Sequence, residues 1–378
     1  MSPTDLPAPD QAPGAPHPRE TQIVFGQDAA EQEFLDAYAS NRLHHGWLLT
    51  GPQGVGKATL AWRIARFLLA TPPADDGGMF DALPPPTSLD IDPEHPVARR
   101  MLAGAEPGLA CITRSANDKG RMRDVIVVDD VRKLNRFFGL SAADGGHRVV
   151  IVDAADDMNV NATNALLKML EEPPARTTLL LVSHQPSRLL ATIRSRCRTL
   201  RLSPLSPDDM QSALAQTGTQ TPEQGEHLAT LASGSVGAAL RLINLGGLQM
   251  YGELIAILNT LPRLDRPRAL ALAEAAAQRG AAEKFELLLT LIDTALSRLA
   301  RTGATGLPPS PEAAPGEAAT LSRLANAPHM GRAWAEVAAI ITARARHGQA
   351  VNLDPASLVL DTFSKIQETA AGNPASRG

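Results

Sequence analysis

Short apolar runs alternate with segments of helical periodicity over the first two hundred residues. The runs predict strands at Trp47–Thr50, Leu109–Ile112, Val125–Val128, Val149–Val152, Thr178–Val182 and Thr199–Leu202. Between them apolar residues recur every three or four positions, which predicts helices over 29–41, 57–70, 129–138, 162–170 and 189–194. Apolar strands that alternate with helices are typical of a parallel α/β sheet covered on both faces.

The pattern changes to helices alone after Pro204. Short helices are predicted over 208–216, 222–232 and 235–245, and longer ones from Met250 onward. Two stretches rich in Pro interrupt the periodicity, and we expect a long loop over 72–96 and a flexible insert over 302–320. We therefore divide the chain into a leader (1–20), an α/β core (21–204), a small helical region (205–247), a larger helical region (248–368) and a tail (369–378).

Composition narrows the class of protein. The chain has 378 residues, 44% hydrophobic and 20% charged, which is typical of a globular protein of two or three domains. Its net charge of −4 argues against a protein that grips DNA alone through many phosphates. Cys111 and Cys197 lie too far apart in sequence for a disulfide framework or a cysteine-only zinc site.

The first residues and the hydropathy of the chain suggest a compartment. Residues 1–18 are rich in Pro and Ala and lack the apolar centre of a signal peptide, so we expect a disordered leader. No apolar run approaches the roughly 18 residues of a membrane span. Two separated cysteines suit a reducing environment. The expectation is a cytoplasmic protein without a membrane partner.

The strongest motif is a glycine-rich loop between the first predicted strand and the next helix. It contains Gly51, Gly54, Gly56 and Lys57 and matches a phosphate-binding loop, in which backbone N–H groups and a lysine surround the phosphates. The alternative is a plain glycine-rich turn before a helix. The Ser or Thr that ligates Mg²⁺ should follow the lysine directly, but Ala58 stands there. Thr59 follows one residue later, about 100° around the helix.

An acidic residue ends the predicted strand Val149–Val152. Asp153 stands where the second ATPase motif places a Mg²⁺-binding carboxylate. Taken alone, an Asp after an apolar strand is more often a helix cap, and Asp156 offers the same capping role. The pairing of Asp153 with the glycine loop favours a nucleotide site, for which ATP is the candidate ligand. We expect no resident metal ion.

A basic run, Arg194-Ser195-Arg196-Cys197-Arg198, lies between a short helix and a strand. The run is either a solvated surface or the carrier of an arginine that reaches a neighbouring subunit's ATP. Before it, the helix that contains Asn164 and Lys168 ends at Pro173 and Pro174. Packing alone explains most of that amphipathic helix.

Together these features resemble the clamp-loader branch of the AAA+ ATPases, over about residues 23–245 and more loosely to 363. The resemblance rests on the glycine loop, the Asp153 strand, the Leu170-Glu171-Glu172-Pro173-Pro174 helix end and the Ser195-Arg196-Cys197 triplet. It implies an α/β P-loop (AAA+) core with a parallel sheet, a three-helix lid over 205–247, and an all-α collar over 248–368. It also implies that Arg196 acts in trans as an arginine finger.

Three departures from the family pattern fall on catalytic parts. Ala58 replaces the Mg²⁺-binding hydroxyl, Ala154 replaces the water-activating Glu, and Gly237 stands where the motor subunits carry a lid arginine. Arg241, one turn later, is the candidate replacement. The combination resembles the stationary kind of clamp-loader subunit, which supplies a finger without hydrolysing ATP itself. We expect no zinc, because Cys111 alone falls where such subunits often carry a four-cysteine module.

The resemblance also implies partners. They are a gamma/tau motor subunit and a delta subunit in a hetero-pentameric ring, with the sliding clamp and primed DNA reached mainly through the assembly. The ring is part of a nucleotidyltransferase, the DNA polymerase III holoenzyme. Two alternatives stay open: an active AAA+ motor or branch-migration helicase, and a scaffold whose glycine loop and arginines have no catalytic role. A small-molecule kinase is a weaker third.

Overall fold

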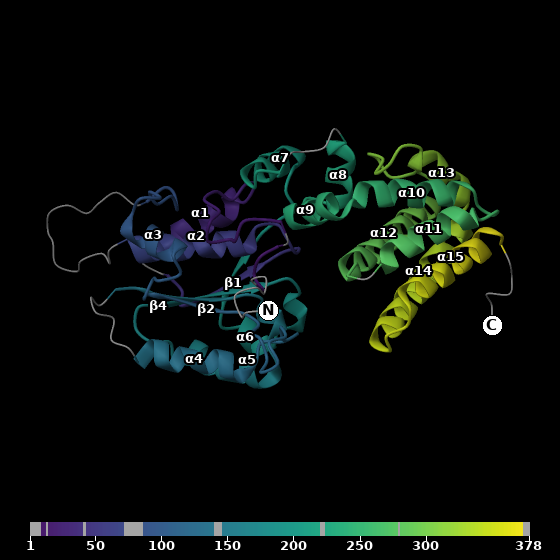
Figure 1. Cartoon of the computed structure of the whole chain (residues 1–378). Helices are drawn as coiled ribbons and strands as arrows, with labels where there is room; N and C mark the ends of the chain where they lie inside the picture. The colour runs from purple at the N-terminus through teal and green to yellow at the C-terminus, as the bar shows by residue number, and fades with distance from the viewer. Residues whose placement is uncertain are drawn as a thin grey trace. The chain divides into compact units, whose positions relative to one another are not determined.

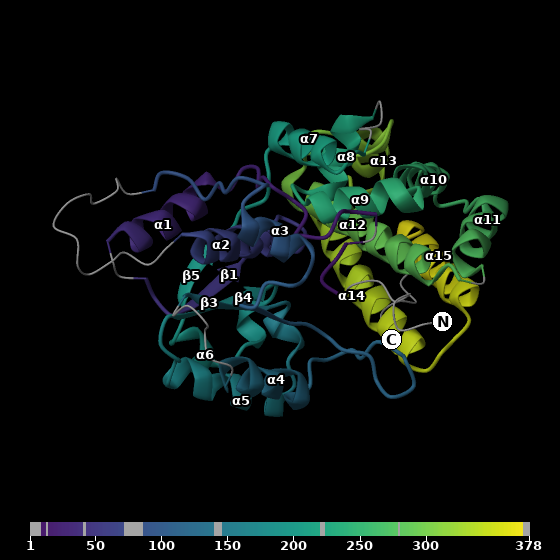
Figure 2. The ribbon, with the colours of Figure 1, turned by 60° about the vertical axis from the view of Figure 1, so that its left-hand side comes forward.

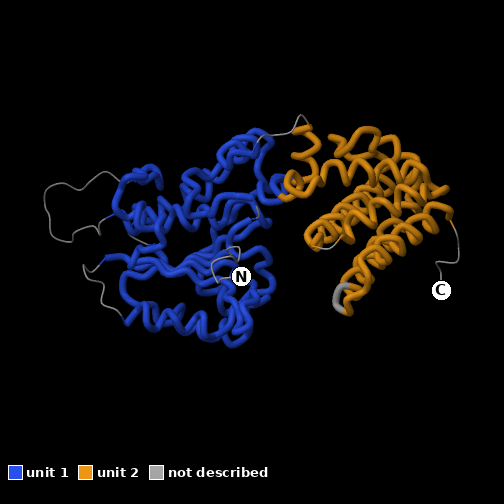
Figure 3. The backbone as a smooth tube through the Cα atoms, in the orientation of Figure 1, with its two compact units in different colours: residues 1–220, 233–240 blue, residues 221–232, 241–378 orange. Residues whose placement is uncertain are grey.

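The computed structural model describes residues 9–12, 14–40, 43–71, 86–139, 146–219, 224–278 and 280–372, except the side chains of 349 and 350. The chain forms two compact units (Figure 3). Unit 1 comprises residues 1–220 and 233–240, and unit 2 comprises 221–232 and 241–378. The boundaries of a separate lid and collar therefore stay a prediction.

Unit 1 is built on a five-stranded parallel sheet in the order β2-β3-β4-β1-β5. The strands are β1 (Gly46–Thr50), β2 (Leu109–Ile112), β3 (Arg148–Val152), β4 (Thr177–Ser183) and β5 (Arg198–Arg201). β1 lies between β4 and β5, with Leu49 opposite Val182 and Leu200. All residues of β1 and β4 are buried, which explains their continuous apolar sequence. The predicted parallel α/β core is confirmed.

Helices cover both faces of this sheet (Figure 1). One layer contains α1 (Asp28–Ala39), α2 (Lys57–Ala70) and α3 (Pro96–Leu102), and the other contains α4 (Val128–Gly139), α5 (Val160–Glu171) and α6 (Ala191–Arg194). The apolar face of α2 buries Leu60, Ile64 and Leu68. The expected strand at Val125–Val128 is wrong: Ile126 makes one isolated parallel bridge to Met158, and α4 begins at Val128.

Helix α7 (Pro207–Gln216) belongs to unit 1, and the following helices lead into unit 2. They are α8 (Gly225–Ala232), α9 (Val236–Leu245), α10 (Gly247–Asn259), α11 (Arg266–Ala277), α12 (Ala282–Thr305), α13 (Glu317–Leu324), α14 (Pro328–Ala350) and α15 (Pro355–Ala370). α12 and α14 lie side by side (Figures 1 and 2). Their backbones approach so closely that a Cβ on Gly303 would come within 2.5 Å of Gly331. The predicted helical C-terminal half is confirmed.

The insert expected to be flexible over 302–320 is instead tied to the helices around it. Glu317, only 1% exposed, receives hydrogen bonds from Arg298 Nε (2.7 Å) and Arg298 Nη2 (2.9 Å) of α12. The Tyr251 hydroxyl of α10 donates to the same carboxylate at 2.6 Å, and the Ala313 N–H donates at 2.5 Å. A buried carboxylate with four donors orders the segment, because leaving it unpaired would be costly.

The prediction of a disordered leader is wrong over residues 14–20, and most of the predicted tail lies outside the described residues. Residues 14–20 form turns on the core, with His17 buried. Residues 1–8, 13 and 373–378 lie outside the described residues, as do 72–85 of the expected Pro-rich loop. None of the helices in the described part of the chain is both long and apolar enough to span a membrane.

The Glu317 cluster gives a stability prediction. Arg298→Ala leaves the buried carboxylate without its cation, so we expect the free energy of unfolding to fall by about 3–5 kcal/mol. Arg268→Ala is the control, because Arg268 is half exposed and its ion pairs are 3.9 and 4.0 Å long. Its loss should cost less than about 1 kcal/mol. Urea denaturation followed by circular dichroism measures both, and equal small losses would contradict the role of the cluster.

Candidate nucleotide site and arginine finger

The glycine loop connects the end of β1 to the start of α2, as a phosphate-binding loop requires. Gly51, Gly54 and Gly56 all have positive φ values, of 144°, 79° and 98°. A Cβ on Gly51 would lie 2.4 Å from the carbonyl oxygen of Leu202, so the close approach to the chain after β5 needs glycine. The loop therefore keeps the backbone shape that phosphate binding demands.

Lys57 is buried and bonded to its own loop. Its ammonium group donates to the carbonyl oxygens of Gly51 (2.7 Å) and Pro52 (2.5 Å). Burial lowers the pKa of Lys57 to about 8, and the carboxylates of Asp153 and Asp156 oppose that shift. A phosphate group at the loop would add negative charge and favour the charged lysine. The ammonium has three N–H donors, and the two carbonyls use two of them.

Two residues that the motif analysis missed hold the loop in place. Gln27 donates to the carbonyl oxygens of Val55 (3.2 Å) and Ser203 (2.8 Å), and accepts from the Ser203 N–H. Ser235 donates to the Gln53 carbonyl at 2.8 Å and caps α9 by accepting from Ala238 N–H. Only the cap carries a local sequence signal, a serine at the start of a predicted helix.

The start of α9 rests directly on the loop. Gly237 donates its N–H to the Gly54 carbonyl at 3.2 Å. A Cβ on Gly54 would lie 2.4 Å from Ser235 Oγ and 2.9 Å from Gly237. The position where the motor subunits carry a lid arginine is thus filled by backbone. Arg241 belongs to unit 2, where it binds the Glu286 carboxylate of α12 at 3.2 Å.

Asp153 follows β3 at the same sheet edge as the loop, as predicted. Its pKa is raised to about 7, mainly by burial and secondly by the Asp10 carboxylate, while the Lys57 ammonium opposes both. Ala154, which follows it, is buried and offers no carboxylate. Ala58 likewise offers no hydroxyl, and Thr59 follows Ala58 on α2. The structure thus brings Gly51, Gly54, Gly56, Lys57 and Asp153 to one edge.

Asp156 does not cap the next helix, as one reading of the sequence allowed. The cap of α5 is Asn159, whose side chain accepts from Ala162 N–H. Asp156 instead binds the end of β4, accepting from Ser183 Oγ (2.7 Å) and from the N–H groups of His184 and Gln185. Burial lowers the pKa of His184 to about 4, and the Lys57 charge lowers it further. A neutral imidazole therefore completes the edge.

Arg196 lies at the opposite edge of the sheet. A Cβ on Gly46, the first residue of β1, would lie 3.1 Å from the Arg196 carbonyl oxygen. Because the glycine loop follows the other end of β1, four rises of about 3.3 Å separate the two edges by roughly 13 Å. Arg196 is 36% exposed and binds Glu171 (2.9 Å) and the Thr192 carbonyl (3.1 Å).

The neighbouring Arg198 contacts both β1 and α1. Its guanidinium lies over the Trp47 ring, 5.1 Å from the centroid, and binds Glu33 at 3.1 Å. These contacts fix the start of β5 against α1 and β1. The Arg198 side chain nevertheless stays 42% exposed, slightly more than that of Arg196.

The shifted carboxyl group gives a pH prediction. Asp153 titrates near 7 in the folded chain and near 4 when unfolded, so the folded state loses stability as the pH rises through 7. Asp153→Asn removes that loss. Its effect on the free energy of unfolding should be more favourable at pH 8 than at pH 5 by about 2–3 kcal/mol. Denaturation at the two pH values tests this, and a pH-independent effect would contradict it.

Known proteins resemble this chain most clearly over unit 1. The family model described as "DNA polymerase III, delta subunit" matches residues 26–206. The DNA polymerase III subunit delta' of Pseudomonas aeruginosa is 38% identical over 214 residues, which cover 56% of this chain and 59% of that protein. The subunit of the same name from Escherichia coli is 33% identical over 213 residues, covering 56% and 58%. The matches thus span just over half the length of these relatives.

More distant similarity extends further along the chain. The tau subunit of Escherichia coli DNA polymerase III is 26% identical over 296 residues, covering 74% of this chain and 41% of that protein. A Thermotoga maritima protein described as related to the DNA polymerase III gamma subunit aligns over 89% of this chain and 99% of its own, with a TM-score of 0.42 and 16% identity. Over residues 26–206 this chain is thus similar to the family described as DNA polymerase III, delta subunit, and the two curated relatives named above are delta-prime subunits.

Proposed function

We propose that this chain is a clamp-loader subunit of DNA polymerase III and acts in DNA replication as a stator. It does not hydrolyse ATP, and it supplies Arg196 in trans to the ATP site of a neighbouring subunit. The observation that carries this proposal is the position of Arg196, roughly 13 Å from its own glycine loop across the sheet. At that edge the guanidinium binds Glu171 and the Thr192 carbonyl.

The residues of the chain's own site fit ATP only in part. The glycine loop and Lys57 would hold the phosphates, and Asp153, which follows β3, would be the carboxylate for a Mg²⁺ ion that arrives with the nucleotide. Ala58 supplies no hydroxyl to that ion, and Ala154 cannot orient an attacking water. Phosphoryl transfer depends on positioning and electrostatics, so losing both groups removes hydrolysis, while the glycine loop and Lys57 remain for nucleotide binding.

Arg196 keeps what a finger in trans requires. Its side chain is partly exposed, and its two partners, Glu171 and Thr192, hold it at the surface without burying it. Exposed ion pairs of this kind contribute about 0–1 kcal/mol. A phosphate of a neighbouring ATP can therefore replace the Glu171 carboxylate at little cost.

The proposed partners follow from the relatives' names. Those relatives are delta', tau and gamma subunits of DNA polymerase III. We place this chain beside a gamma/tau motor subunit and a delta subunit in a hetero-pentameric ring. The sliding clamp and primed DNA are reached mainly through that ring, in keeping with the chain's net charge of −4.

ATP turnover tests the stator. The chain alone should show no steady-state hydrolysis, and adding it to the motor and delta subunits should raise theirs. Arg196→Ala should lower the rate of the assembled ring several-fold, because a finger is worth about 10³–10⁵ at its own site while other sites keep theirs. Arg201→Ala is the matched control, an exposed arginine on β5.

Each other result assigns a different function. Turnover by the chain alone would make it an active motor. A ring that assembles normally and hydrolyses ATP equally well with Arg196→Ala would reduce the chain to a scaffold. Assembly is measured separately by gel filtration, so a failure to assemble is not read as loss of the finger.

A further inference from the structure

Three elements of unit 1 meet at the Arg196 edge of the sheet: the amino end of β1, the last turn of α5 and the turn before β5. A Cβ on Gly46, the first residue of β1, would lie 2.9 Å from Leu170 Cδ2, 3.1 Å from the Arg196 carbonyl oxygen and 3.3 Å from Cys197 Sγ. A side chain at position 46 would not fit, so the three elements are in direct contact. In packing this close, a shift of one element displaces the others.

The sequence after α5 deprives one of its last carbonyl groups of a helical donor. In an α-helix the Leu170 oxygen would accept from the N–H of residue 174, but Pro173 and Pro174 have no N–H. His45, directly before β1, supplies a donor instead, with 3.0 Å between its Nε2 and the Leu170 oxygen. Because a carbonyl oxygen can only accept, the proton of this bond lies on Nε2.

The neighbours of His45 hold its ring in this orientation. The His44 ring stacks on it, with 4.4 Å between the centroids and 26° between the planes. The carbonyl oxygen of His45 accepts from the Leu179 N–H of β4 at 2.7 Å, which fixes its backbone to the sheet. Mainly burial, and secondly the charge that His44 can carry, lower the pKa of His45. The ring is therefore neutral near pH 7, with its one N–H directed at α5.

The residue after Leu170 holds the proposed finger. Glu171 Oε1 lies 2.9 Å from Arg196 Nη2, and the Thr192 carbonyl accepts from Nη1 at 3.1 Å. A guanidinium has five N–H donors, so these two bonds leave three for a phosphate. The direction of those three N–H groups depends on where Glu171 lies. Glu171 in turn belongs to the turn of α5 that His45 ties to β1.

We propose that His45 is a positioning residue for Arg196, because its bond to the Leu170 carbonyl fixes the last turn of α5, and with it Glu171 and the guanidinium, against β1. The inference rests on the proposed arginine finger and names the residue that orients it. The gain is preorganisation: an arginine already held in one conformation loses less side-chain entropy when it meets a phosphate.

Two substitutions separate the His45 ring from its hydrogen bond. His45→Phe keeps a ring that can stack on His44 but removes the N–H, whereas His45→Gln keeps an amide N–H for the Leu170 carbonyl. ATP turnover is measured in the ring assembled with the motor and delta subunits. One hydrogen bond corresponds to about two- to tenfold at the finger's own site. His45→Phe should therefore lower kcat, though less than Arg196→Ala does, and His45→Gln should restore most of the loss.

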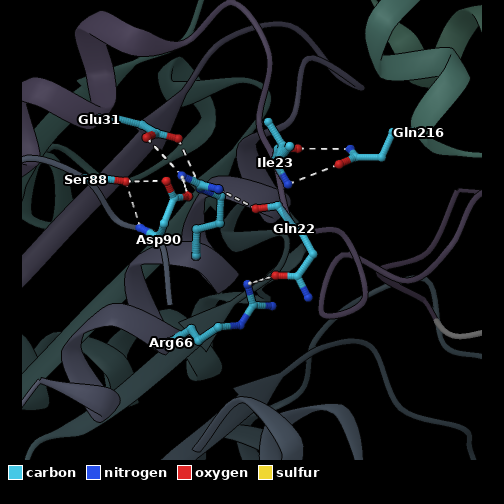
Figure 4. A network of polar contacts seen from close by, with 8 residues as sticks. Gln22, Ile23, Glu31, Arg66, Ser88, Asp90 and Gln216 are labelled. Atoms are coloured by element: carbon cyan, nitrogen blue, oxygen red, sulfur yellow. Dashed lines mark hydrogen bonds and ion pairs between the residues drawn. The ribbon is translucent and has the colours of Figure 1, made fainter. Parts of the chain in front are cut away.

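Gln216→Ala is the matched control. Gln216 of α7 also binds the backbone of unit 1, accepting from the Ile23 N–H at 3.1 Å and donating to the Ile23 carbonyl at 3.0 Å (Figure 4). The Ile23 segment leads to Gln27, which binds Val55 of the glycine loop at the other end of β1. Its loss should leave the turnover of the ring unchanged. Gel filtration and urea denaturation check that each variant assembles and folds.

A double-mutant cycle gives the deciding readout. If His45 acts through Arg196, His45→Phe should have no further effect in a chain that already carries Arg196→Ala. Unchanged turnover with His45→Phe alone, an equal loss in both backgrounds, or equal losses with His45→Phe and His45→Gln would overturn the positioning role and leave the finger standing. Turnover that does not respond to Arg196→Ala would overturn the finger and this inference with it.

The place of the imidazole proton gives a readout that needs no variant and no partner. NMR of the ring nitrogens in the wild-type chain should show a neutral His45 that carries its proton on Nε2. A proton on Nδ1 would overturn the proposal, because the Leu170 carbonyl would then have no donor from this ring. This measurement decides the matter even where His45→Phe fails to fold.

Discussion

The buried ammonium group of Lys57 is the constraint around which the nucleotide site is built. A charged lysine taken out of water needs compensating oxygens, and here Gly51 and Pro52 supply them from the loop itself. Only a loop with left-handed glycines can turn its carbonyls inward in this way. Gln27 and Ser235 then fix the loop from α1 and α9, so the site is held rigid by parts of unit 1 far apart in sequence.

The glycine loop and Arg196 lie at opposite ends of the central strand β1. Its carboxyl end carries the glycine loop beside Asp153 and His184, and its amino end lies against Arg196. The strand between them is fully buried. Under the proposed function, Ala58 and Ala154 act on hydrolysis at one end of β1, and Arg196 lies at the other end.

Most of the fold could be predicted from the local pattern of apolar residues and glycines, whereas only part of the candidate site could. The five strands and the glycine loop are readable because burial on both faces demands continuous apolar residues and tight turns demand glycine. The hydrogen bonds of Gln27 and Asp156 could not be predicted from local pattern, because their partners lie 176 and 27 residues away in sequence. The strand expected at Val125–Val128 failed because its apolar residues belong to a helix start and a single bridge.

Composition gave the wrong prediction for residues 14–20 of the leader and for the insert over 302–320. In each segment one pair of buried polar side chains forms part of an ordered structure. Both stretches are rich in Pro, Ala and Gly, the composition of chains that bury too little apolar surface to fold. Each nevertheless contains a buried pair of polar side chains, His17 with Asp10 and Glu317 with Arg298. Two residues change the composition of a segment very little. They stabilise its folded form, because separating them would leave a buried polar group without its partner. Of the two carboxylates, that of Glu317 is bonded more extensively, because it accepts hydrogen bonds from four donors.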